Sequence, residues 1–585
     1  MTISTLDQRR VDAGSVEDLR NDGKLITKVG DHPVVVFWHD DRPYAIEDRC
    51  PHMGFPLHRG TIEAGLLTCH WHHARFDLRS GCTLDLFADD AVAFDTAIDN
   101  GRVLVWARHL PDPEVRLHRR LHDGLEDGLD LVIAKAVLGL LAADVPPERL
   151  VRNGLEFGAM NRQAGWSAGM TVLVAMANLL PHLRAEDRPS ALVHGLTFVS
   201  ADTRGNPPRF PLAPLGTGDV DRDRLVGWYR RFIETRSADA AERVLATALA
   251  AAPPPQAEPM MMAAITDHVF IDGGHTLDFT NKAMEALMFV GEDAGALLLP
   301  TLVTQTARAS RAEETSRWRH PDNLAAMLRD IDARLPAMAA EGQAAGAEVA
   351  LDAESLAWRL LDDDPSGVTD ALEHALAAGA AGEDVGRAVA YAAALRITRF
   401  HTQNDFGDWN TVHHAFTTAN ALHQALRRNT TGELLRGVFQ CALRVYLDRF
   451  LNVPAARLPE ATTGDLRDLD ECWRVQGRVD DAGAIVAGYL RGGGRRSEVV
   501  AELGHALLEE DAGFHWYQVI EAGVRQAYAW PERSEPSTLI LAGVARFLAA
   551  HTPTRRRLPT TISIARRLRR GDHLYEDVDS GASTG

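Results

Sequence analysis

The spacing of apolar residues divides the chain into a strand-rich beginning and a long helical remainder. From Ser15 to about Arg108, short β-branched and aromatic runs such as Pro33–Trp38 alternate with turn residues. From Leu117 to about Leu548, apolar residues recur at intervals of three and four, which is the period of an amphipathic helix. We therefore predict a multidomain protein with an N-terminal all-β domain followed by a large all-α region.

Local signals place the boundaries within this plan. Short strands are expected at Tyr44–Ile46 and on both sides of the hairpin turn Asp99-Asn100-Gly101. A proline-rich stretch at 253–259 is typical of a stiff linker. The expected parts are a tail at 1–13, the β domain at 14–108, a helical subdomain at 109–252, the linker at 253–259, a histidine-rich helical domain at 260–552, and a C-terminal helix with a disordered end at 553–585.

One short stretch in the β domain carries metal-ligand chemistry. Sixteen residues separate Cys50-Pro51-His52 from Cys69-His70-Trp71-His72, so two thiolates and two imidazoles recur at short spacing. A tetrahedral zinc ion accepts such a set. A [2Fe–2S] cluster in which two His replace two Cys on one iron accepts it as well. The order of the ligands favours the cluster, because each loop supplies one Cys and one His.

The flanking residues strengthen this interpretation. Arg49–Gly60 and Cys69–Gly81 resemble the two cluster loops of Rieske proteins, and the resemblance covers roughly residues 14–108. It implies that Cys50 and Cys69 bind one iron and that His52 and His72 bind the other through exposed imidazoles. It also implies a small antiparallel β fold.

A departure from the Rieske pattern bears on the reduction potential. Respiratory-type Rieske proteins carry an extra Cys in each loop and a Ser after the second His, and this chain has neither; Ala74 follows His72-His73. Fewer hydrogen bonds to the cluster lower its potential. We therefore predict a low-potential, ferredoxin-like cluster suited to oxygen chemistry.

Charge and cysteine usage exclude several classes of partner. The net charge of −19 argues against nucleic acid and anionic membranes. Five Cys, two of them in the cluster motif, leave no disulfide framework, and the longest apolar run, Met170–Leu180, is too short to span a bilayer. The N-terminal residues have no apolar core, so no secretory signal is expected and we predict a soluble cytoplasmic protein.

The helical region is rich in histidines that precede an acid by four residues. The pairs are His182–Glu186, His268–Asp272, His401–Asp405 and His505–Glu509. Because positions i and i+4 share one face of a helix, such pairs could converge on a metal or a substrate. Two His and one carboxylate bind non-haem Fe(II), and His268, Asp272 and His275 fit that set by type. The alternative is that these residues make helix caps and interhelical hydrogen bonds.

Two common motifs are missing from the sequence. The iron motif of ring-hydroxylating oxygenases, D-x-x-H-x-x-x-x-H, starts at Asp272-x-x-His275 but has Thr280 in place of the second His. No G-x-G-x-x-G follows a predicted strand, so a Rossmann domain for NAD(P)H is not expected. Electrons should therefore come from an external ferredoxin or reductase.

The helical region shows a second resemblance. Segments His413–Leu426, Leu434–Phe450 and Glu510–Ala527 are similar to questin-oxidase-like proteins, a helical, His-rich family that includes enzymes opening anthraquinone rings. The resemblance implies an oxidoreductase acting on an aromatic or polyketide substrate. The residues matching its His-led helices are His275, His413, His414 and His515.

These observations lead to one main hypothesis and one alternative. The main hypothesis is a Rieske oxidoreductase whose cluster delivers single electrons to a monooxygenase-like site in the helical domain, with His275, His413 and His515 as candidate catalytic residues. The alternative is an electron-transfer or redox-sensing protein whose helical region is a partner-binding scaffold. Convergence of the histidines on one place would favour the first, and scattering over the surface would favour the second.

Overall fold

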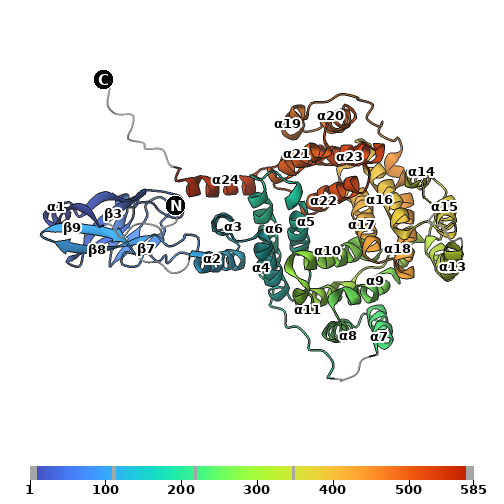
Figure 1. Cartoon of the computed structure of the whole chain (residues 1–585), viewed down its shortest axis with the longest axis horizontal. Helices are drawn as coiled ribbons and strands as arrows, with labels where there is room; N and C mark the ends of the chain where they lie inside the picture. The colour runs from blue at the N-terminus through green and yellow to red at the C-terminus, as the bar shows by residue number, and fades with distance from the viewer. Residues whose placement is uncertain (1–9, 109–112, 217–220, 345–349, 573, 575–585) are drawn as a thin grey trace. The chain divides into compact units, whose positions relative to one another are not determined.

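The structure is a computed structural model that describes residues 10–108, 113–216, 221–344, 350–572 and 574. Its contacts divide the chain into two units. The first unit contains Met1–Pro146 and Leu558–Gly585, and the second contains Pro147–Arg557. The predicted fold class is confirmed, since strands occupy the N-terminal part and helices follow to Arg570 (Figure 1).

Two antiparallel sheets build the β domain of the first unit. A six-stranded sheet has the order β1-β9-β8-β4-β3-β2, and a three-stranded sheet has the order β5-β6-β7. Their bounds are β1 (Val11–Ser15), β2 (Lys24–Val29), β3 (His32–His39), β4 (Arg42–Glu47), β5 (Thr61–Glu63), β6 (Leu66–Thr68), β7 (Arg75–Asp77), β8 (Ala93–Asp99) and β9 (Arg102–Ala107). A short helix, α1 (Val16–Asp22), lies between β1 and β2.

Strand β3 separates the two cores of this domain. Val34 and Val36 face the core beneath α1, whereas Val35 and Phe37 face the core that includes Cys50 and Cys69. Side chains alternate between the faces of a strand, so a strand buried on both faces has a continuous apolar run. This arrangement explains the sequence Pro33–Trp38 and anchors the two cysteines in a packed interior.

Three helices complete the first unit: α2 (Pro113–Asp127), α3 (Asp130–Ala142) and α24 (Arg557–Arg570). The C-terminal segment returns to the β domain, where Arg49 Nη2 donates to the carbonyl of Asp572 at 2.7 Å. The structure thus differs from the expected boundaries, which placed 109–252 and 553–585 in separate parts. The expected tail at 1–13 also differs, because Val11–Ser15 pairs with β9 as an edge strand. Most of the disordered end that the sequence predicts lies outside the described residues.

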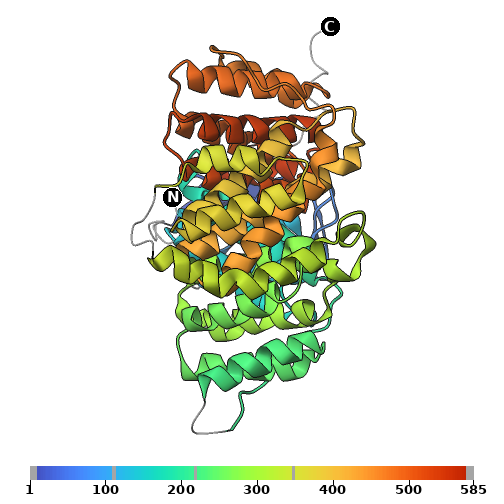
Figure 2. The ribbon, with the colours of Figure 1, turned by 90° about the vertical axis from the view of Figure 1, so that its right-hand side faces the viewer.

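The described residues of the second unit form helices joined by loops and contain no strand. Its main helices are α4 (Pro147–Met160), α5 (Ala168–Leu179), α6 (Arg188–Thr203), α7 (Arg222–Glu234), α8 (Ala238–Ala251), α9 (Glu258–Thr266), α10 (His275–Val290), α11 (Gly295–Leu298), α12 (Val303–Arg308), α13 (Leu324–Ala344), α14 (Ala353–Arg359), α15 (Pro365–Ala377), α16 (Gly382–Thr398), α17 (Trp409–Arg428), α18 (Gly432–Leu447), α19 (Leu469–Arg474), α20 (Val479–Arg491), α21 (Arg496–Leu508), α22 (Phe514–Tyr528) and α23 (Glu535–His551). Figure 2 shows these helices lying in successive rows.

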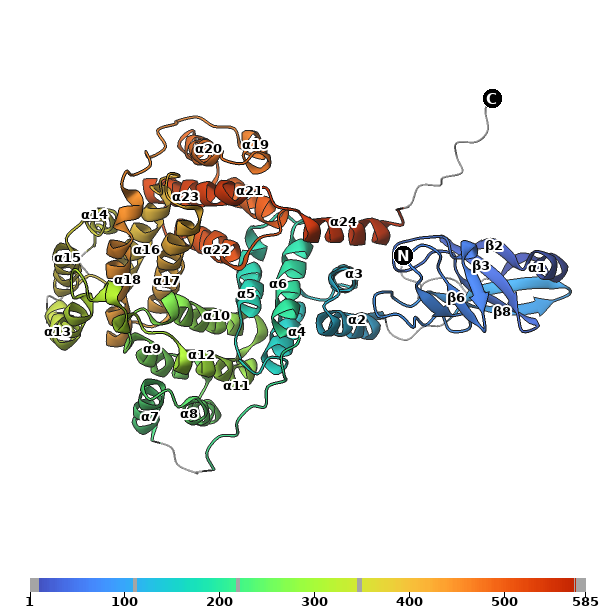
Figure 3. The ribbon, with the colours of Figure 1, turned by 180° about the vertical axis from the view of Figure 1, so that it is seen from behind.

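The centre of the second unit is formed by α16, α17, α22 and α23. Residues 388–398 of α16 are all buried, and Arg396 within this stretch donates to the Val445 carbonyl and to Asn452. Helices α5 and α10 contact each other, and they pack against α22 and α17 of this centre, respectively (Figure 3). Within the described chain, no helix is both long enough and apolar enough to cross a bilayer.

The expected linker at 253–259 does not separate two bundles. Pro254–Ala257 forms a short 3-10 helix that leads directly into α9, and Pro254, Ala257 and Glu258 are buried. Proline suits the first turn of a helix because its missing N–H would have no partner there. The proline-rich stretch is therefore a helix start inside one unit, and the helices on both sides belong to the same unit.

Candidate functional site

The two cysteine–histidine loops of the β domain have the same backbone conformation. Cys50 lies in the loop between β4 and β5, and Cys69 directly follows β6. The Cys50 N–H donates to the carbonyl of Phe55 at 2.7 Å, and the Cys69 N–H donates to that of Ala74 at 2.9 Å. Each Cys carbonyl in turn accepts from the residue four positions later, Gly54 or His73, and both of these have a positive φ. The repeated turn presents one Cys and one His from each loop.

The four predicted ligands lie together in this structure. The cysteines are 2% and 1% exposed, and the ring centroids of His52 and His72 are 4.9 Å apart. A hydrogen bond from the Cys50 thiol lowers the pKa of Cys69 to about 6, so the two sulfur atoms are adjacent. His72 is exposed, whereas His52 is partly buried. The thiolates are buried and His72 is exposed, whereas His52 differs from the expected exposed imidazole because its Nδ1 atom is buried.

A metal cluster fits these residues. The buried Nδ1 atom of His52 has no hydrogen-bond partner among the described residues, which suits a metal ligand. Burial lowers the pKa of His52 to about 4, so its imidazole is neutral and can bind metal at pH 7. Cys50, Cys69, His52 and His72 would hold a [2Fe–2S] cluster, which takes up and releases one electron at a time.

A cation lies beside the first loop. Lys135 of α3 donates from Nζ to the carbonyl of Pro51 at 2.6 Å and also forms an ion pair with Asp89. Arg120 of α2 binds the same Asp89 at 2.9 Å, so the carboxylate keeps a partner if Lys135 is removed. The helices α2 and α3 therefore place positive charge next to the ligand His52.

We expect Lys135→Met to lower the reduction potential of the cluster, because the ammonium group favours the added electron. Loss of one charge at this range corresponds to about 1 kcal/mol, or about 40 mV for a one-electron couple. A redox titration followed by EPR measures the shift. Arg102→Met removes the same charge from an exposed pair with Asp12 and serves as the control. A potential that moves equally in both variants would contradict a local effect of Lys135.

A second group of histidines lies in the helical unit. His275 is the first residue of α10, His413 and His414 belong to α17, and His515 is the second residue of α22. One ring nitrogen from each of His275, His414 and His515 lies within 4.8 Å of the others, and we call these three the histidine site. His413 lies behind it, with its ring 4.1 Å from that of His515.

The backbone just before α10 allows His275 to lie close to α17. Gly274 has φ +99°, and a Cβ atom there would lie 1.9 Å from Thr418 Oγ1 of α17. Only glycine tolerates both the left-handed conformation and the close contact. The Gly273-Gly274 pair therefore ends the preceding 3-10 turn and lets His275 start α10 against α17.

The electrostatic environment keeps the imidazoles neutral. Burial and the neighbouring His515 lower the pKa of His275 to about 4, and burial lowers that of His414 to about 2. His413 is 1% exposed, its pKa is held well below the usual value by burial, and neither ring nitrogen has a partner among the described residues. Neutral imidazoles with free lone pairs are what a transition metal requires.

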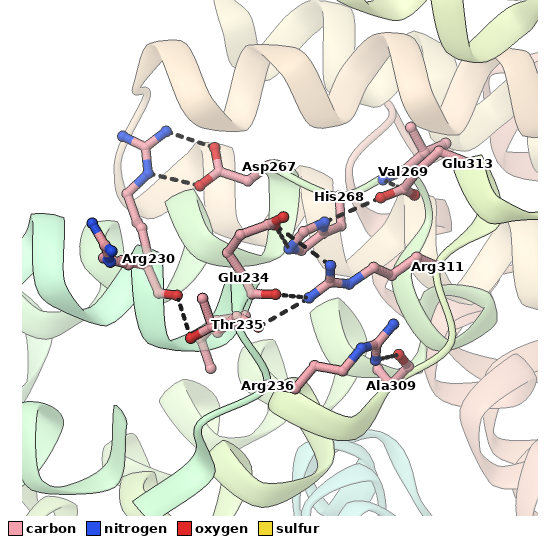
Figure 4. A network of polar contacts seen from close by, with 12 residues as sticks. Arg230, Glu234, Thr235, Arg236, Asp267, His268, Val269, Ala309, Arg311 and Glu313 are labelled. Carbon is pink, nitrogen blue, oxygen red and sulfur yellow. Dashed lines mark hydrogen bonds and ion pairs between the residues drawn. The ribbon is translucent and has the colours of Figure 1, made fainter. Parts of the chain in front are cut away.

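The structure does not bring together the expected set His268, Asp272 and His275. His268 lies between Glu313 and Glu234, at 3.1 Å and 3.2 Å, as Figure 4 shows. Asp272 lies in a turn, and its backbone N–H donates to the carbonyl of Ser310. Left-handed backbone at Phe270 and Asp272 interrupts the helix that would align the set, so His275 groups with His414 and His515 instead.

The other histidine–acid pairs do not form the predicted convergent pattern. His505 binds Asp187 at 3.1 Å rather than Glu509, and His194 binds the Tyr517 hydroxyl at 2.7 Å. His401 accepts a hydrogen bond from the backbone of Gln403. The polar residues that sequence analysis missed are Gln518 and Asp278. Their signal was the spacing i, i+3 after His515 and His275, which places them on the same helix faces.

Comparisons with known proteins agree with the geometry of the two loops. The model of the Rieske [2Fe-2S] domain family matches residues 9–93. The ferredoxin component of the alkene monooxygenase system of Xanthobacter autotrophicus is 30% identical over 102 residues, which is 17% of this chain and 84% of that protein. A human Rieske domain-containing protein is 33% identical over 72 residues, covering 12% of this chain and 46% of that protein. The anthranilate 1,2-dioxygenase ferredoxin subunit of Burkholderia cepacia is 29% identical over 68 residues, covering 12% and 63%.

The fold and the ligand set define an iron–sulfur electron-transfer domain. Through its N-terminal residues, the chain belongs to the Rieske [2Fe–2S] domain family. Its cofactor is a [2Fe–2S] cluster, and its Rieske domain is homologous to ferredoxin components of oxygenase systems. This relationship supports electron transfer and an oxidoreductase role.

Proposed function

We propose that this protein is an oxidoreductase whose Rieske cluster delivers single electrons to a monooxygenase-like site in the helical unit. That site is the histidine site, His275, His414 and His515, which would hold one iron ion. An external ferredoxin or reductase supplies the electrons.

The observation that carries the proposal is the convergence of the histidine site. Three imidazoles from three different helices place their ring nitrogens within 4.8 Å of one another, and a buried, unpartnered fourth imidazole lies behind them. The group found among the described residues contains no carboxylate, and imidazole ligands suit iron, copper, zinc and nickel. A supply of single electrons is useful only to a redox-active metal, which favours iron over zinc.

The residues around the site support a small organic substrate. Phe279 and Phe514 lie beside His275, with ring centroids 5.4 Å and 5.8 Å from it, so part of the site is apolar and aromatic. His275, His414 and His515 are each partly exposed, which leaves the group accessible from one side. Aromatic side chains pack well against aromatic ligands. The resemblance of this region to questin-oxidase-like proteins points to the same substrate class, an aromatic or polyketide molecule.

The proposed reaction balances with two electrons. One atom of O2 enters a substrate bond and the other becomes water, which requires two electrons and two protons. The Rieske cluster holds one electron at a time, so it must be reduced twice in each turnover. Bound iron would activate O2, while His275, His414 and His515 hold the metal and the aromatic side chains hold the substrate.

Iron content tests this function. Protein purified without oxygen should contain about three irons per chain, two of them in the cluster. We expect His414→Ala to reduce the count to two while the Rieske EPR signal of the dithionite-reduced protein stays unchanged. His423→Ala is the matched control, because His423 is a buried histidine of the same helix that binds Gln526 outside the site.

Two irons in the wild-type protein, with an unchanged count in His414→Ala, would overturn the metal assignment. The helical unit would then be a metal-free pocket or a partner-binding scaffold. Loss of the cluster signal in His414→Ala would show instead that the variant is misfolded, so circular dichroism is recorded alongside, and His275→Ala repeats the test from another helix.

A further inference from the structure

Gln518 lies between the histidine site and a fully buried carboxylate. His515 and Gln518 face each other on α22, with Nδ1 of His515 3.0 Å from Oε1 of Gln518. The Gln518 amide Nε2 donates to Oδ2 of Asp278 on α10. We propose that Gln518 and Asp278 are positioning residues that fix the orientation and tautomer of His515 and tune its strength as a metal ligand. This inference rests on the proposed function of the histidine site.

The direction of the hydrogen-bond chain follows from its end group. An ionised carboxylate can only accept, so Asp278 must receive the amide N–H of Gln518. The amide oxygen of Gln518 then faces His515 and must accept from its Nδ1–H. The proton on His515 is thereby held at Nδ1, and Nε2 keeps its lone pair. That Nε2 atom lies 3.4 Å from Nε2 of His414, at the centre of the histidine site.

The arrangement resembles a carboxylate–histidine–metal triad in which an amide side chain lies between the carboxylate and the histidine. Metal-binding histidines usually donate their second N–H to a carboxylate or carbonyl, which orients the ring and raises its basicity. Here the carbonyl is the side chain of Gln518, and the carboxylate of Asp278 fixes which way the amide points. Neither residue would bind the metal itself.

A buried ionic network continues from Asp278 along the same two helices. Lys282 lies one turn after Asp278 and binds Glu285 and Glu521, each at 2.9 Å. Arg525 binds Glu521 at 2.6 Å, and Asn178 of α5 donates to both glutamates at 2.8 Å. The polar faces of α10 and α22 thus form a ladder that starts at His275 and His515.

The balance of charge in the ladder singles out Asp278. It contains three carboxylates, Asp278, Glu285 and Glu521, but two cations, Lys282 and Arg525, and the cations contact the glutamates directly. The charged groups that act on Asp278 are Lys282 and Glu285 on its own helix and Glu521 on α22. Burial, opposed by Lys282, raises the pKa of Asp278 to about 7. Its charge should therefore change near neutral pH, while the site histidines stay neutral.

The expected consequence is a pH-dependent metal affinity. Ionised Asp278 polarises the Gln518 amide, which makes His515 a stronger electron-pair donor to the metal. Protonation of Asp278 removes this effect. Affinity should therefore fall as the pH drops through about 7.

Cobalt(II) binding to the full chain, with the Rieske cluster intact, tests the inference through the visible ligand-field bands of the bound ion. We expect Gln518→Leu to weaken Co(II) binding about 10- to 100-fold. Asp278→Asn can still accept from Gln518, so it should bind at pH 7 but lose the inflection near neutral pH. The exchange variant Gln518→Glu with Asp278→Asn keeps an acceptor for His515 and a donor between the helices, and it should recover most of the affinity lost in Gln518→Leu.

Gln526→Leu is the matched control. Gln526 is a buried glutamine of the same helix whose Oε1 lies 3.1 Å from Nδ1 of His423, outside the histidine site. It should leave Co(II) affinity and its pH dependence unchanged. Wild-type affinity in Gln518→Leu, or an unchanged pH profile in Asp278→Asn, would overturn the positioning role alone. Absence of Co(II) binding to the wild-type protein would overturn the metal site, and with it both this inference and the proposed function.

Discussion

Replacing Cys69 with Ala should remove the Rieske cluster and with it all electron delivery by this chain. Cys69 is 1% exposed and lies in the core of the β domain, so no water or neighbouring side chain can take the place of its thiolate. Iron in such a cluster requires the soft sulfur ligand. We expect the variant to lose two irons per chain and the EPR signal of the reduced cluster, and substrate oxidation to fall to background.

Cys82→Ser provides the control for this variant. Cys82 is an exposed thiol of the same domain that lies outside the two loops, and its replacement should leave the cluster intact. The iron proposed for the histidine site should remain in Cys69→Ala, which separates loss of the electron donor from loss of the proposed catalytic site. A Cys69→Ala protein with full iron content and an unchanged signal would contradict the assignment of this ligand.

The cluster loops were predictable because their chemistry is local. Each loop places Cys and His two or three positions apart, and the short-range hydrogen bonds at Cys50 and Cys69 set the conformation within five residues. The same holds for much of the secondary structure. The run at Pro33–Trp38 is buried on both faces and forms β3, and the periodic stretch Asp384–Arg396 lies within α16.

The histidine site depends on contacts that no local pattern describes. His275, His414 and His515 are separated by more than 100 residues, and they meet because Gly274 permits the close approach of α10 to α17. The pairing of His268 with Asp272 assumed an uninterrupted helix, whereas positive φ angles at Phe270 and Asp272 break it. Long-range packing also explains why the C-terminal segment belongs to the first unit.

Replacing Lys282 with Met should strongly destabilise the helical unit, because Lys282 is the buried cation of the ladder beside the histidine site. Lys282 is 0% exposed and neutralises Glu285 and Glu521, each 2.9 Å from its Nζ atom. Removing one partner leaves buried charge uncompensated, which costs about 3–5 kcal/mol. Urea unfolding followed by far-UV circular dichroism, which reports mainly on this helix-rich unit, measures the loss.

The destabilisation caused by Lys282→Met should decrease as the pH falls. Burial alone would raise the pKa of Glu285, but Lys282 and then Arg525 outweigh it and hold that pKa at about 2. Because the pKa of Glu285 is lower in the folded protein than its unfolded value of 4.5, ionised Glu285 stabilises the folded state above pH 4.5. This stabilisation is lost as the pH falls toward 2. Lys282→Met removes most of the depression, so its destabilisation should be large at pH 7 and smaller at pH 4.

Two further variants distinguish buried charge from lost packing. Arg334→Met breaks an exposed pair with Glu373 and should cost less than about 1 kcal/mol. Adding Glu285→Gln to Lys282→Met removes the uncompensated charge, keeps an acceptor for Asn178 and leaves Glu521 as the partner of Arg525, so it should recover much of the stability. If Lys282→Met were as mild as Arg334→Met, the ladder would not be an ionic network. If the double variant recovered nothing, the cost would come from packing of the lysine side chain, because only charge compensation predicts that removing a further charged group restores stability.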